Sequence, residues 1–525
     1  MVSSAWRIAL LGAVAPVLAA PTARDTITYT SYADRTAAVQ EAFDRGWNGY
    51  YTYAFPHDEL APLSKSYLDD FGGWGASAVD ALSTATIMGD KKVVNQILDY
   101  IPKIDFTKAT YTSSISLFET TIRYLGGLLS AYDLLSGPAN DLVDNQDNLA
   151  SVLDQAVNLA DLLSVAFDTG TGIPYNNLDW SPVRPQAADT NGLATIGTLV
   201  LEWTHLSDLT GNQTYAQLSQ KAESYLLNPQ PKDIAEPFPG LLGSAISIST
   251  GNFTNSNGGW GGGTDSFYEY LIKMYLYDTS RFGAYKDRWV AAIDSSIKYI
   301  ASHPTSRPDL TFLAGWNNAT SLSYSSQHLA CFDGGNFILG GLILDRQDYV
   351  DFGIELVDGC HDTYASTATK IGPEIFDWQD SAVSANAPNN PPPPAAQTDF
   401  YAQAGFWIPD GGADYILRPE VMESYYYAWR ATGDTKYQDW GWDAFLAINS
   451  TCSVDDVGFT GISNVNVAGG GSKYDEQESF FFAEVMKYSY LIQAPEAVWQ
   501  VSADGDNTYV FNTEAHPIKI AGSPA

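Results

Sequence analysis

The chain has 525 residues, of which 45% are hydrophobic and 13% aromatic, a composition that supports a large packed core and excludes global disorder. Its formal net charge is −34 and its isoelectric point is about 4.2, so nucleic acid, whose phosphates would be repelled, is excluded as a partner. The excess of acids is typical of a protein that stays soluble in acidic surroundings.

The first 19 residues predict a secretory signal peptide. Arg7 precedes an apolar run from Ile8 to Leu18, and Val17-Leu18-Ala19 matches a small-residue cleavage site. The run is too short to cross a bilayer, and no later apolar stretch is long enough either, so we expect cleavage after Ala19 and no membrane span. Residues 20–525 should then form a single domain that acts as a monomer in the secretory pathway, secreted or held in secretory vesicles.

N-glycosylation sequons and the cysteine content are both consistent with passage through the secretory pathway. The three cysteines permit one disulfide in an oxidising compartment, and a Cys331–Cys360 bridge would close a loop of about 30 residues. Such a bridge is worth about 3–4 kcal/mol in chain entropy, and Cys452 would remain as a buried thiol. N-glycosylation is predicted at four N-x-[ST] sequons, at Asn212, Asn252, Asn318 and Asn449.

Helical hairpins recur through the chain. Residues 79–101, 198–226 and 424–448 each contain an apolar-periodic helix, a glycine, an Asp or Asn, and a second amphipathic helix. Glycine suits the left-handed end of the first helix, and Asp or Asn suits the start of the second. The first helix of each pair is apolar nearly all round and the second is one-sided, which predicts an inner ring inside an outer ring. The expected fold is all-α, an α/α toroid, although the hairpins do not fix how many pairs close it.

Two segments interrupt the helical pattern. Ala385–Ala396 contains four consecutive prolines, which exclude a helix and favour an extended surface loop. Residues 498–513 hold two β-rich runs around Asp504-Gly505-Asp506-Asn507 and predict a β-hairpin. A lone hairpin is marginally stable in water, so we expect it to pack on another surface, of which the bore of the toroid is one.

Carboxylates that interrupt apolar helical patterns are the first candidate functional residues. Glu119 and Arg123 are four residues apart in a core-like helix, so they share a face as either a structural ion pair or part of a site. Glu420 and Glu423 follow Pro419 near a helix start. There they either complement the helix dipole or bind a cation or a proton.

A glycine-rich stretch, NGGWGGGT, precedes another two acids. Asp265 and Glu269 open a helix, and the glycines form either a flexible loop or a backbone that approaches a ligand closely. Trp74 near Asp80 is an arrangement that sugar sites use for stacking, although 14 tryptophans make any one placement weak evidence.

Several chemistries lack their motifs. The sequence contains no HExxH, CxxC, nucleotide-binding glycine loop or GxSxG elbow, and Asp504 and Asp506 do not continue into an EF-hand loop. What remains is a set of acids, many aromatic residues and no signature of an organic cofactor. This profile suits glycoside hydrolysis by two carboxylates.

Eight stretches occur in one order from about residue 40 to residue 517: FGGWGASAVDALSTATIMGD, SISLFETTIRYLGGLLSAYDLL, FDTGTGIPY, TDSFYEYLIK, QHLACFDGGNFILGG, YILRPEVMESYYYAWRATGD, ESFFFAEVMKYSYL and VFNTEAHP. In these stretches the chain resembles the class I α-1,2-mannosidases of glycoside hydrolase family 47, particularly their secreted fungal branch. The resemblance implies an (αα)7 barrel plugged by a C-terminal β-hairpin, with residues 20–525 as one catalytic domain. It also implies inverting, Ca²⁺-dependent exo-hydrolysis of terminal α-1,2-linked mannose from high-mannose N-glycans, on glycoproteins or as free oligosaccharides.

The resemblance further implies residue roles. Glu119 would be the general acid and Glu420 the general base, and Asp265 would do acid or base work. Thr513 would hold Ca²⁺ through its carbonyl and hydroxyl oxygens, while waters and sugar hydroxyls complete the coordination. The family disulfide matches Cys331–Cys360. Residues that would hold those waters or the substrate are Glu423, Glu478, Glu514, Arg123 and Arg418.

Two positions depart from the endoplasmic-reticulum-type members of the family. Ser83 stands where those enzymes carry an aspartate, and Gly263 stands where they carry an arginine that grips one glycan branch. These differences predict a wider pocket that trims several α-1,2-mannoses with a broad branch preference. The alternative from another class is a mannose-binding quality-control factor on the same fold, and a second alternative is a six-pair glucoamylase-type toroid.

Overall fold

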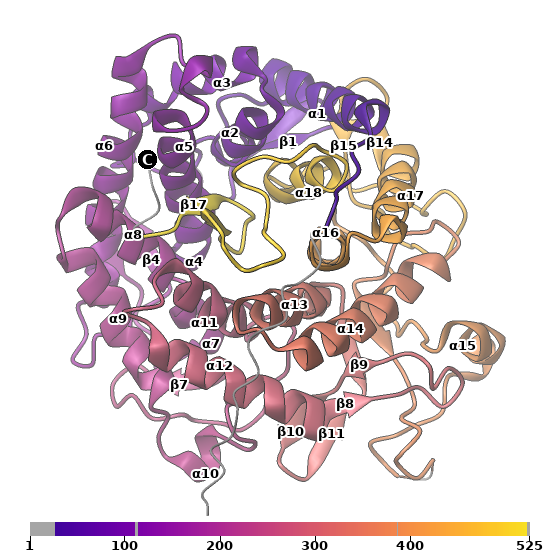
Figure 1. Cartoon of the computed structure of the whole chain (residues 1–525). Coiled ribbons are helices and arrows are strands. Elements are labelled where there is room, and N and C mark those ends of the chain that lie inside the picture. Colours follow the sequence, from indigo (N-terminus) through magenta and orange to yellow (C-terminus); the bar gives the residue numbers. More distant parts are fainter. Residues whose placement is uncertain (1–26, 111–113, 386, 522–525) are drawn as a thin grey trace, which may run out of the picture.

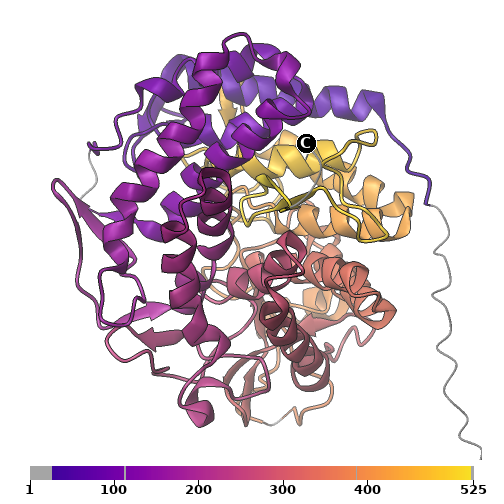
Figure 2. The ribbon, with the colours of Figure 1, turned by 60° about the vertical axis from the view of Figure 1, so that its left-hand side comes forward.

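The computed structural model describes residues 27–110, 114–385 and 387–521. The predicted signal peptide, residues 1–19, lies outside the described residues. Helices dominate the described part, and they surround a C-terminal segment that lies near the middle of the ring (Figure 1). A view turned by 60° keeps that segment between the N-terminal helices and the helices of residues 420–451 (Figure 2).

The described helices form two layers. The inner helices pack one on the next in chain order, and the last packs on the first. They are α2 (Ala76–Met88), α5 (Gly126–Ser136), α8 (Val200–Thr210), α11 (Asp265–Tyr277), α13 (Asp333–Ile343), α16 (Glu420–Thr432) and α18 (Met486–Leu491). Each inner helix is covered by one outer helix. In the same order as the inner helices, the outer helices are α3 (Lys91–Leu98), α6 (Gln146–Leu163), α9 (Thr214–Leu227), α12 (Gly283–Ser295), α14 (Gln347–Ala365), α17 (Thr435–Thr451) and α1 (Ala33–Tyr53).

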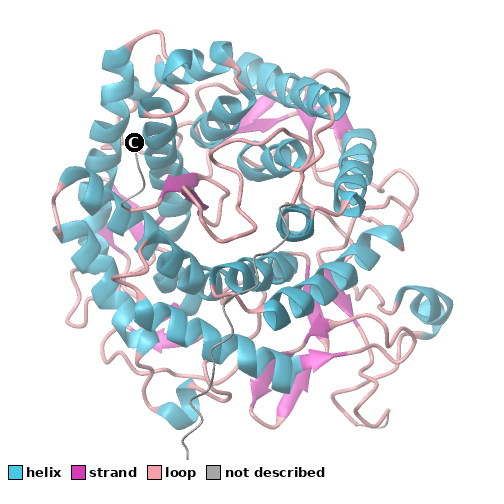
Figure 3. Cartoon of the chain, in the orientation of Figure 1, coloured by secondary structure: helices cyan, strands magenta, loops and turns pink. Residues whose placement is uncertain are grey.

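Strands are short (Figure 3), and those before α18 belong to the connections between helices. One three-stranded sheet joins β3 (Ile115–Ser116), β4 (Asn177–Trp180) and β5 (Val183–Pro185). The other described strands pair in twos: β1 (Glu59–Ala61) with β2 (Ser66–Leu68), β6 (Thr190–Gly192) with β7 (Ala245–Ser247), β8 (Ala301–Ser302) with β9 (Phe312–Leu313), β10 (Gly315–Asn318) with β11 (Ser321–Ser323), β12 (Ser325–Gln327) with β13 (Ile375–Asp377), β14 (Ser453–Val454) with β15 (Gly458–Phe459), and β16 (Tyr509–Phe511) with β17 (Pro517–Lys519).

Short helical segments fill other connections. They comprise α-helical, 3-10 and π-helical turns, of which η2, η5 and η8 are π-helical. Their bounds are α4 (Leu117–Thr120), α7 (Leu193–Gly197), α10 (Lys232–Ala235), α15 (Thr398–Ala404), η1 (Ile101–Lys103), η2 (Thr121–Leu125), η3 (Asn140–Leu142), η4 (Ser164–Phe167), η5 (Ser296–Ile300), η6 (Leu329–Phe332), η7 (Ala395–Gln397) and η8 (Phe481–Val485).

The predicted helical hairpins are confirmed. Asp90 caps α3 by accepting a hydrogen bond from the backbone N–H of Val93 (3.0 Å), and Asp434 caps α17 in the same way. Asn212 differs, because it lies one residue before the cap position of α9. Every residue of α2 is buried, whereas α3 buries one face, as the inner and outer layers require. The first helix of each pair ends at a glycine in the left-handed conformation, at Gly89, Gly211 and Gly433.

The predicted β-hairpin near the C-terminus exists, but its predicted position is wrong. The paired strands are β16 and β17, and the turn between them runs from Asn512 to His516 rather than through Asp504-Gly505. Residues 498–503 form no strand, and side chains of α16 bind both backbone groups of Val501 in their midst. Arg430 Nε donates to the carbonyl of Val501 (2.6 Å), and the Tyr426 hydroxyl accepts from the N–H of the same residue (2.9 Å).

One described helical segment, Gln146–Phe167, is long and apolar enough by length and composition to cross a membrane. The expectation that no later stretch meets this criterion is therefore wrong. The segment consists of α6 and η4, and its buried residues, such as Val152 and Leu159, recur at helical spacing. Since α6 packs on α5, this pattern is also that of an outer helix covering an inner one.

The predicted surface features lie where the sequence indicates. The proline-rich stretch is irregular up to η7, as predicted, with residue 386 outside the described part of the chain. Asn449 is half-buried in α17, where its side-chain oxygen accepts a hydrogen bond from Arg45. The sequon asparagines that are exposed are Asn212, Asn252 and Asn318.

Cys331 and Cys360 form a disulfide that ties η6 to α14, as predicted, and Cys452 is a buried free thiol. Replacing both bridged cysteines by alanine should lower the free energy of unfolding by about 3–4 kcal/mol, because the sequence separation of 29 closes a sizeable loop in the unfolded chain. Denaturant-induced unfolding checks this value. Cys452→Ala is the matched control, and a loss no greater than in this control would contradict the prediction.

Candidate active site

One cavity of about 400 Å³ gathers most of the predicted site residues. It opens among the inner helices and the C-terminal turn, and Asn176, Thr195 and Phe480 also line it. Glu478 is not among the lining residues within the described part of the chain. The predicted residues that the cavity brings together are Glu119, Arg123, Gly263, Asp265, Arg418, Glu420, Glu423, Thr513 and Glu514.

Two π-helical turns carry site residues. Glu119 lies in the first turn of α4, where Ser116 Oγ accepts a hydrogen bond from its backbone N–H (3.2 Å). The helix then widens into η2, which holds Arg123, and the second π-turn, η8, holds Glu484. A π-turn accommodates an extra residue and so changes the direction in which side chains point, and such turns are frequent at functional sites.

Arg123 is the centre of an ion-pair network. Its Nε and Nη2 atoms lie 3.0 and 2.9 Å from Glu119 Oε2, and its Nη1 lies 2.9 Å from Glu514 Oε1. Nη1 also donates to Ser479 Oγ (3.1 Å) and is 3.9 Å from Asp80 Oδ2. Burial alone would lower the pKa of Arg123, but the surrounding carboxylates hold it well above its usual range. The guanidinium therefore stays charged and fixes the position of Glu119.

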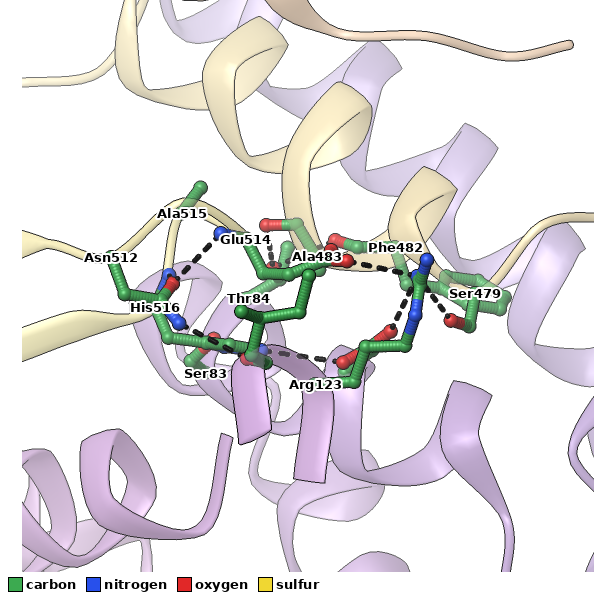
Figure 4. A network of polar contacts seen from close by, with 12 residues as sticks. Ser83, Thr84, Arg123, Ser479, Phe482, Ala483, Asn512, Glu514, Ala515 and His516 are labelled. Carbon is green, nitrogen blue, oxygen red and sulfur yellow. Dashed lines mark hydrogen bonds and ion pairs between the residues drawn. The ribbon is translucent and has the colours of Figure 1, made fainter. Parts of the chain in front are cut away.

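The C-terminal turn is held by its own side chains and by the inner helices (Figure 4). Asn512 Oδ1 accepts hydrogen bonds from the N–H groups of Glu514 (2.9 Å) and His516 (2.8 Å). Asn512 Nδ2 donates to the carbonyl of Ile122 (3.0 Å), beside Arg123 in η2. The asparagine thus joins the turn that carries Thr513 to the segment that carries the arginine.

Glu420 opens α16 and is held by a buried histidine. Glu420 Oε2 lies 2.7 Å from His328 Nδ1, and His328 Nε2 lies 2.7 Å from the Tyr364 hydroxyl. Burial alone would raise the pKa of Glu420, but the hydrogen bond and charge of His328 and the charge of Arg418 hold it below its ordinary value. Glu420 is therefore a carboxylate over most of the acidic range. The nearby Leu417 has a φ of 68°, a strained conformation of a kind found at functional sites.

Asp265 begins α11 on another wall of the cavity. Its Oδ1 accepts a hydrogen bond from the N–H of Ser266 (2.8 Å). Burial raises the pKa of Asp265 to about 7, with the negative charges of Glu269 and Glu420 acting in the same direction. Asp265 thus holds its proton under conditions in which Glu420 has lost its own, a division that suits acid–base chemistry.

The acids around Thr513 form a site that a divalent cation fits. Burial raises the pKa of both Glu423 and Glu514 to about 8 and that of Glu484 well above its ordinary value. Glu514 Oε2 is buried without a hydrogen-bond partner among the described residues. A divalent cation bound among these carboxylates would favour their charged forms and would give the unpaired buried oxygen a partner.

A second acidic cluster lies apart from the cavity lining. Ligand atoms of Glu59, Glu476 and Glu478 lie within 4.8 Å of one another, a spacing that a metal ion could bridge. Glu478 belongs to this cluster rather than to the lining of the cavity. The charges of Arg123 and Arg418 still lower its pKa, but burial and Glu476 outweigh them and raise the value to about 7.

Three residues singled out in the sequence have structural roles instead. Trp74 is buried and donates its indole N–H to the carbonyl of Lys108 (2.6 Å), so it is not a stacking platform. Asp80 and Ser83 contact His516 at 3.2 and 2.9 Å, beneath the C-terminal turn, and neither lines the cavity. Having serine rather than aspartate at position 83 therefore changes a contact beneath the C-terminal turn and not the lining of the cavity.

Sequence reasoning missed several residues of the site. Glu484 interrupts the apolar run FFFAEVM, the same signal that identified Glu119, and could have been found in that way. Glu269 was recognised only as opening a helix, yet it lines the cavity and pairs with Lys273. His328 and Asn176 carry no local signal, because their partners are distant in sequence.

A ring of helical hairpins with acids and arginines around a cavity is an arrangement that suits a glycoside hydrolase. The family model for glycosyl hydrolase family 47 matches residues 42–520, and the chain belongs to this family. It is 61% identical over 484 residues to a mannosyl-oligosaccharide α-1,2-mannosidase of Penicillium citrinum, covering 92% of this chain and 91% of that protein. Mannosyl-oligosaccharide α-1,2-mannosidase 1B of Aspergillus phoenicis is 59% identical, over 93% of this chain and 92% of its own length.

A solved structure agrees with these matches. The α-1,2-mannosidase from Trichoderma reesei superimposes with a TM-score of 0.90 at 52% identity, covering 94% of this chain and all of that one. The predicted family is thereby confirmed, together with a mostly helical fold of the family type.

Arg123→Met should lower the free energy of unfolding by about 3–5 kcal/mol, because it leaves buried Glu514 and its neighbours without their counter-charge. The loss should shrink at low pH, where protonation relieves the unpaired carboxylates. Denaturant unfolding at two pH values measures both effects. Arg184→Met, which breaks an exposed pair with Asp179, is the control and should change little. Equal losses in the two variants would contradict this reading.

Proposed function

We propose that the protein is an inverting, Ca²⁺-dependent exo-α-1,2-mannosidase that removes terminal mannose from high-mannose N-glycans. The observation that carries the proposal is the convergence of Glu119, Asp265 and Glu420 on one cavity beside Thr513. Family membership and the printed activities of the fungal relatives support the same reaction and substrate class.

Glu420 is the general base in this mechanism. An inverting enzyme needs a carboxylate that removes a proton from a water molecule as the water attacks the anomeric carbon. The low pKa of Glu420 keeps it ionised, and His328 fixes the direction of its carboxylate. Water and sugar occupy the space between Glu420 and the acids across the cavity.

Glu119 and Asp265 form the acid side of the cavity. The leaving oxygen of the glycosidic bond needs a proton, and Asp265 is the group that still holds one near neutral pH. Glu119, fixed by Arg123, is positioned to pass a proton or to stabilise the positive charge that develops on the sugar ring. Arg418, paired with Glu374 (2.5 Å), binds substrate hydroxyls at the rim.

Ca²⁺ would be held by the carbonyl and hydroxyl oxygens of Thr513. When bound, it supplies a site for the 2- and 3-hydroxyls of the terminal mannose and favours a distorted ring. Glu478 lies outside the cavity lining but interacts through its charge with Arg123, Arg418 and Glu119, and it would support the water ligands from behind the lining acids. The lining acids that would hold the remaining water ligands are Glu269, Glu423, Glu484 and Glu514.

The finer architecture belongs to the same proposal. Seven inner and seven outer helices among the described residues support an (αα)7 barrel, with the β16–β17 hairpin as its plug. We assign residues 1–19 to a signal peptide and 20–525 to one catalytic domain of a secreted or vesicular monomer, glycosylated at the exposed sequons. A Cβ at Gly263 would meet open space, which supports a wide entrance and a broad branch preference.

The pH dependence follows from the two pKa shifts. A raised pKa means that Asp265 keeps its proton at low pH, so kcat/KM should fall as pH rises through about 7. The lowered pKa of Glu420 keeps this base ionised at acidic pH. Activity should therefore persist there and fall only below the ordinary pKa range of a glutamate. His328→Phe should move this acidic limb to higher pH. A pH–rate profile checks both limbs, and an acidic limb that does not move in the variant would contradict the role of His328.

The test of the whole proposal is mannose release from α-1,2-linked mannobiose, with and without EDTA. Release should stop with EDTA and return with Ca²⁺, and Glu420→Gln should lower kcat by about 10²–10⁴-fold with an unchanged fold. Absence of release under every condition would favour the mannose-binding alternative. Release that ignores exhaustive metal removal would overturn the role of Thr513.

A further inference from the structure

The glycine-rich loop before Asp265 has a second cavity on its other side. This groove, of about 350 Å³, is lined by the loop of residues 257–264, the β10–β11 hairpin and strand β12. Gly262 lines both the groove and the catalytic cavity, so the two adjoin. The mechanism proposed above makes no use of the groove.

The floor of the groove is fixed backbone. Gly258 and Trp316 exchange two backbone hydrogen bonds of 2.9 Å each, which tie the loop to β10. A Cβ at Gly258 would lie 2.7 Å from the carbonyl oxygen of Leu242, so only glycine fits there. The groove is therefore formed before any ligand arrives, and its shape costs little to maintain on binding.

The partition between the two cavities is also backbone. Gln327 Oε1 accepts a hydrogen bond from the N–H of Gly262 (2.9 Å) and holds this ridge in place. A Cβ at Gly263 would meet nothing within 4 Å, so the residue after the ridge adds no bulk there. The side chains of Gln327 and Leu329 flank the ridge, each 3.3 Å from where a Cβ of Gly262 would lie. A branched molecule can therefore straddle the ridge with one branch in each cavity.

The chemistry of the groove differs from that of the catalytic cavity. No residue that lines the groove is ionisable, although the protein carries a formal charge of −34 and the catalytic cavity is lined by seven carboxylic acids. A cation, a phosphate or a charged peptide would find no counter-charge there. Hydroxyls and amides, which both donate and accept, suit a neutral polyhydroxyl ligand. Those groups include Asn257, Asn317, Ser323, Ser326 and Gln327.

We propose that this groove binds an uncut arm of the branched oligosaccharide whose other arm is being trimmed. The inference rests on the proposed function and deepens it by naming a second contact for the substrate. The terminal mannose of one arm enters the catalytic cavity, and a neighbouring arm crosses the ridge at Gly262 and lies among the hydroxyls and amides. Groove contacts then add affinity for large glycans that a disaccharide cannot gain.

Filling the groove tests this proposal. Ser323→Trp places a large side chain in the groove, and Ala319→Trp adds the same bulk at the exposed tip of the same hairpin, outside the lining. The parent and every variant carry Asn318→Gln, so that no glycan of the protein's own lies beside the groove. We expect Ser323→Trp to lower kcat/KM for a free nine-mannose oligosaccharide about tenfold through KM and to leave mannobiose hydrolysis unchanged. Ala319→Trp should change neither.

Each other outcome overturns the proposal. An unchanged oligosaccharide rate would mean that no arm lies in the groove, and equal losses on both substrates would mean that the change disturbs the catalytic cavity. A loss confined to glycans on folded glycoproteins would assign the groove to polypeptide. Asn257→Ala is a milder second variant, in which KM for the oligosaccharide should rise about threefold.

Calorimetric affinity for the same oligosaccharide separates this proposal from the proposed function. The measurement uses Glu420→Gln protein with and without Ser323→Trp, and it needs no turnover. Weaker binding with Ser323→Trp would support the groove even if the parent protein released no mannose. Equal affinity would overturn the groove and leave the proposed reaction intact.

Discussion

Charge balance in the buried centre is the constraint on which the rest of the structure depends. Arg123, Lys273 and Lys487 are nearly inaccessible to solvent, and the acids around them outnumber them. Lys273 and Lys487 donate to the backbone carbonyls of Asn512 and Ala515, so the positive charges also anchor the C-terminal turn. The excess of acid must be neutralised by protons or by a bound cation, and this requirement links the stability of the centre to its chemistry.

The fold meets this constraint by joining parts that lie far apart in sequence. Arg123 on η2 touches Ser479, just before η8, and Glu514 in the C-terminal turn. His328, which follows β12, orients Glu420 at the start of α16. Glu420 is thus held from outside its own hairpin, and Arg123, which holds Glu119, is itself held from the C-terminal segment, so no single hairpin could keep the site in register alone. The closed ring of helices supplies the rigidity that such long-range contacts need.

Local patterns in the sequence predicted the elements better than their contacts. The Gly-Asp junctions identified the hairpins, because caps are decided within a few residues. Glu119 was identified because a carboxylate buried in an apolar run is costly unless a partner compensates its charge. The C-terminal hairpin was misplaced, because residues 498–503 have a β-rich composition but Val501 among them binds Tyr426 and Arg430, more than 70 residues away, instead of a neighbouring strand. His328 was missed for the same reason, since 92 residues separate it from Glu420.

The position of the C-terminal turn has a consequence for biosynthesis. Thr513 and Asn512 emerge from the ribosome after all the helices that enclose them, so the earlier hairpins must wait with an unfilled and strongly acidic interior. A nascent chain that stops short of this turn lacks the contacts that Asn512 and Glu514 make to η2. Assembly of the centre therefore waits for the turn that follows the last described helix, the turn that would hold the cation.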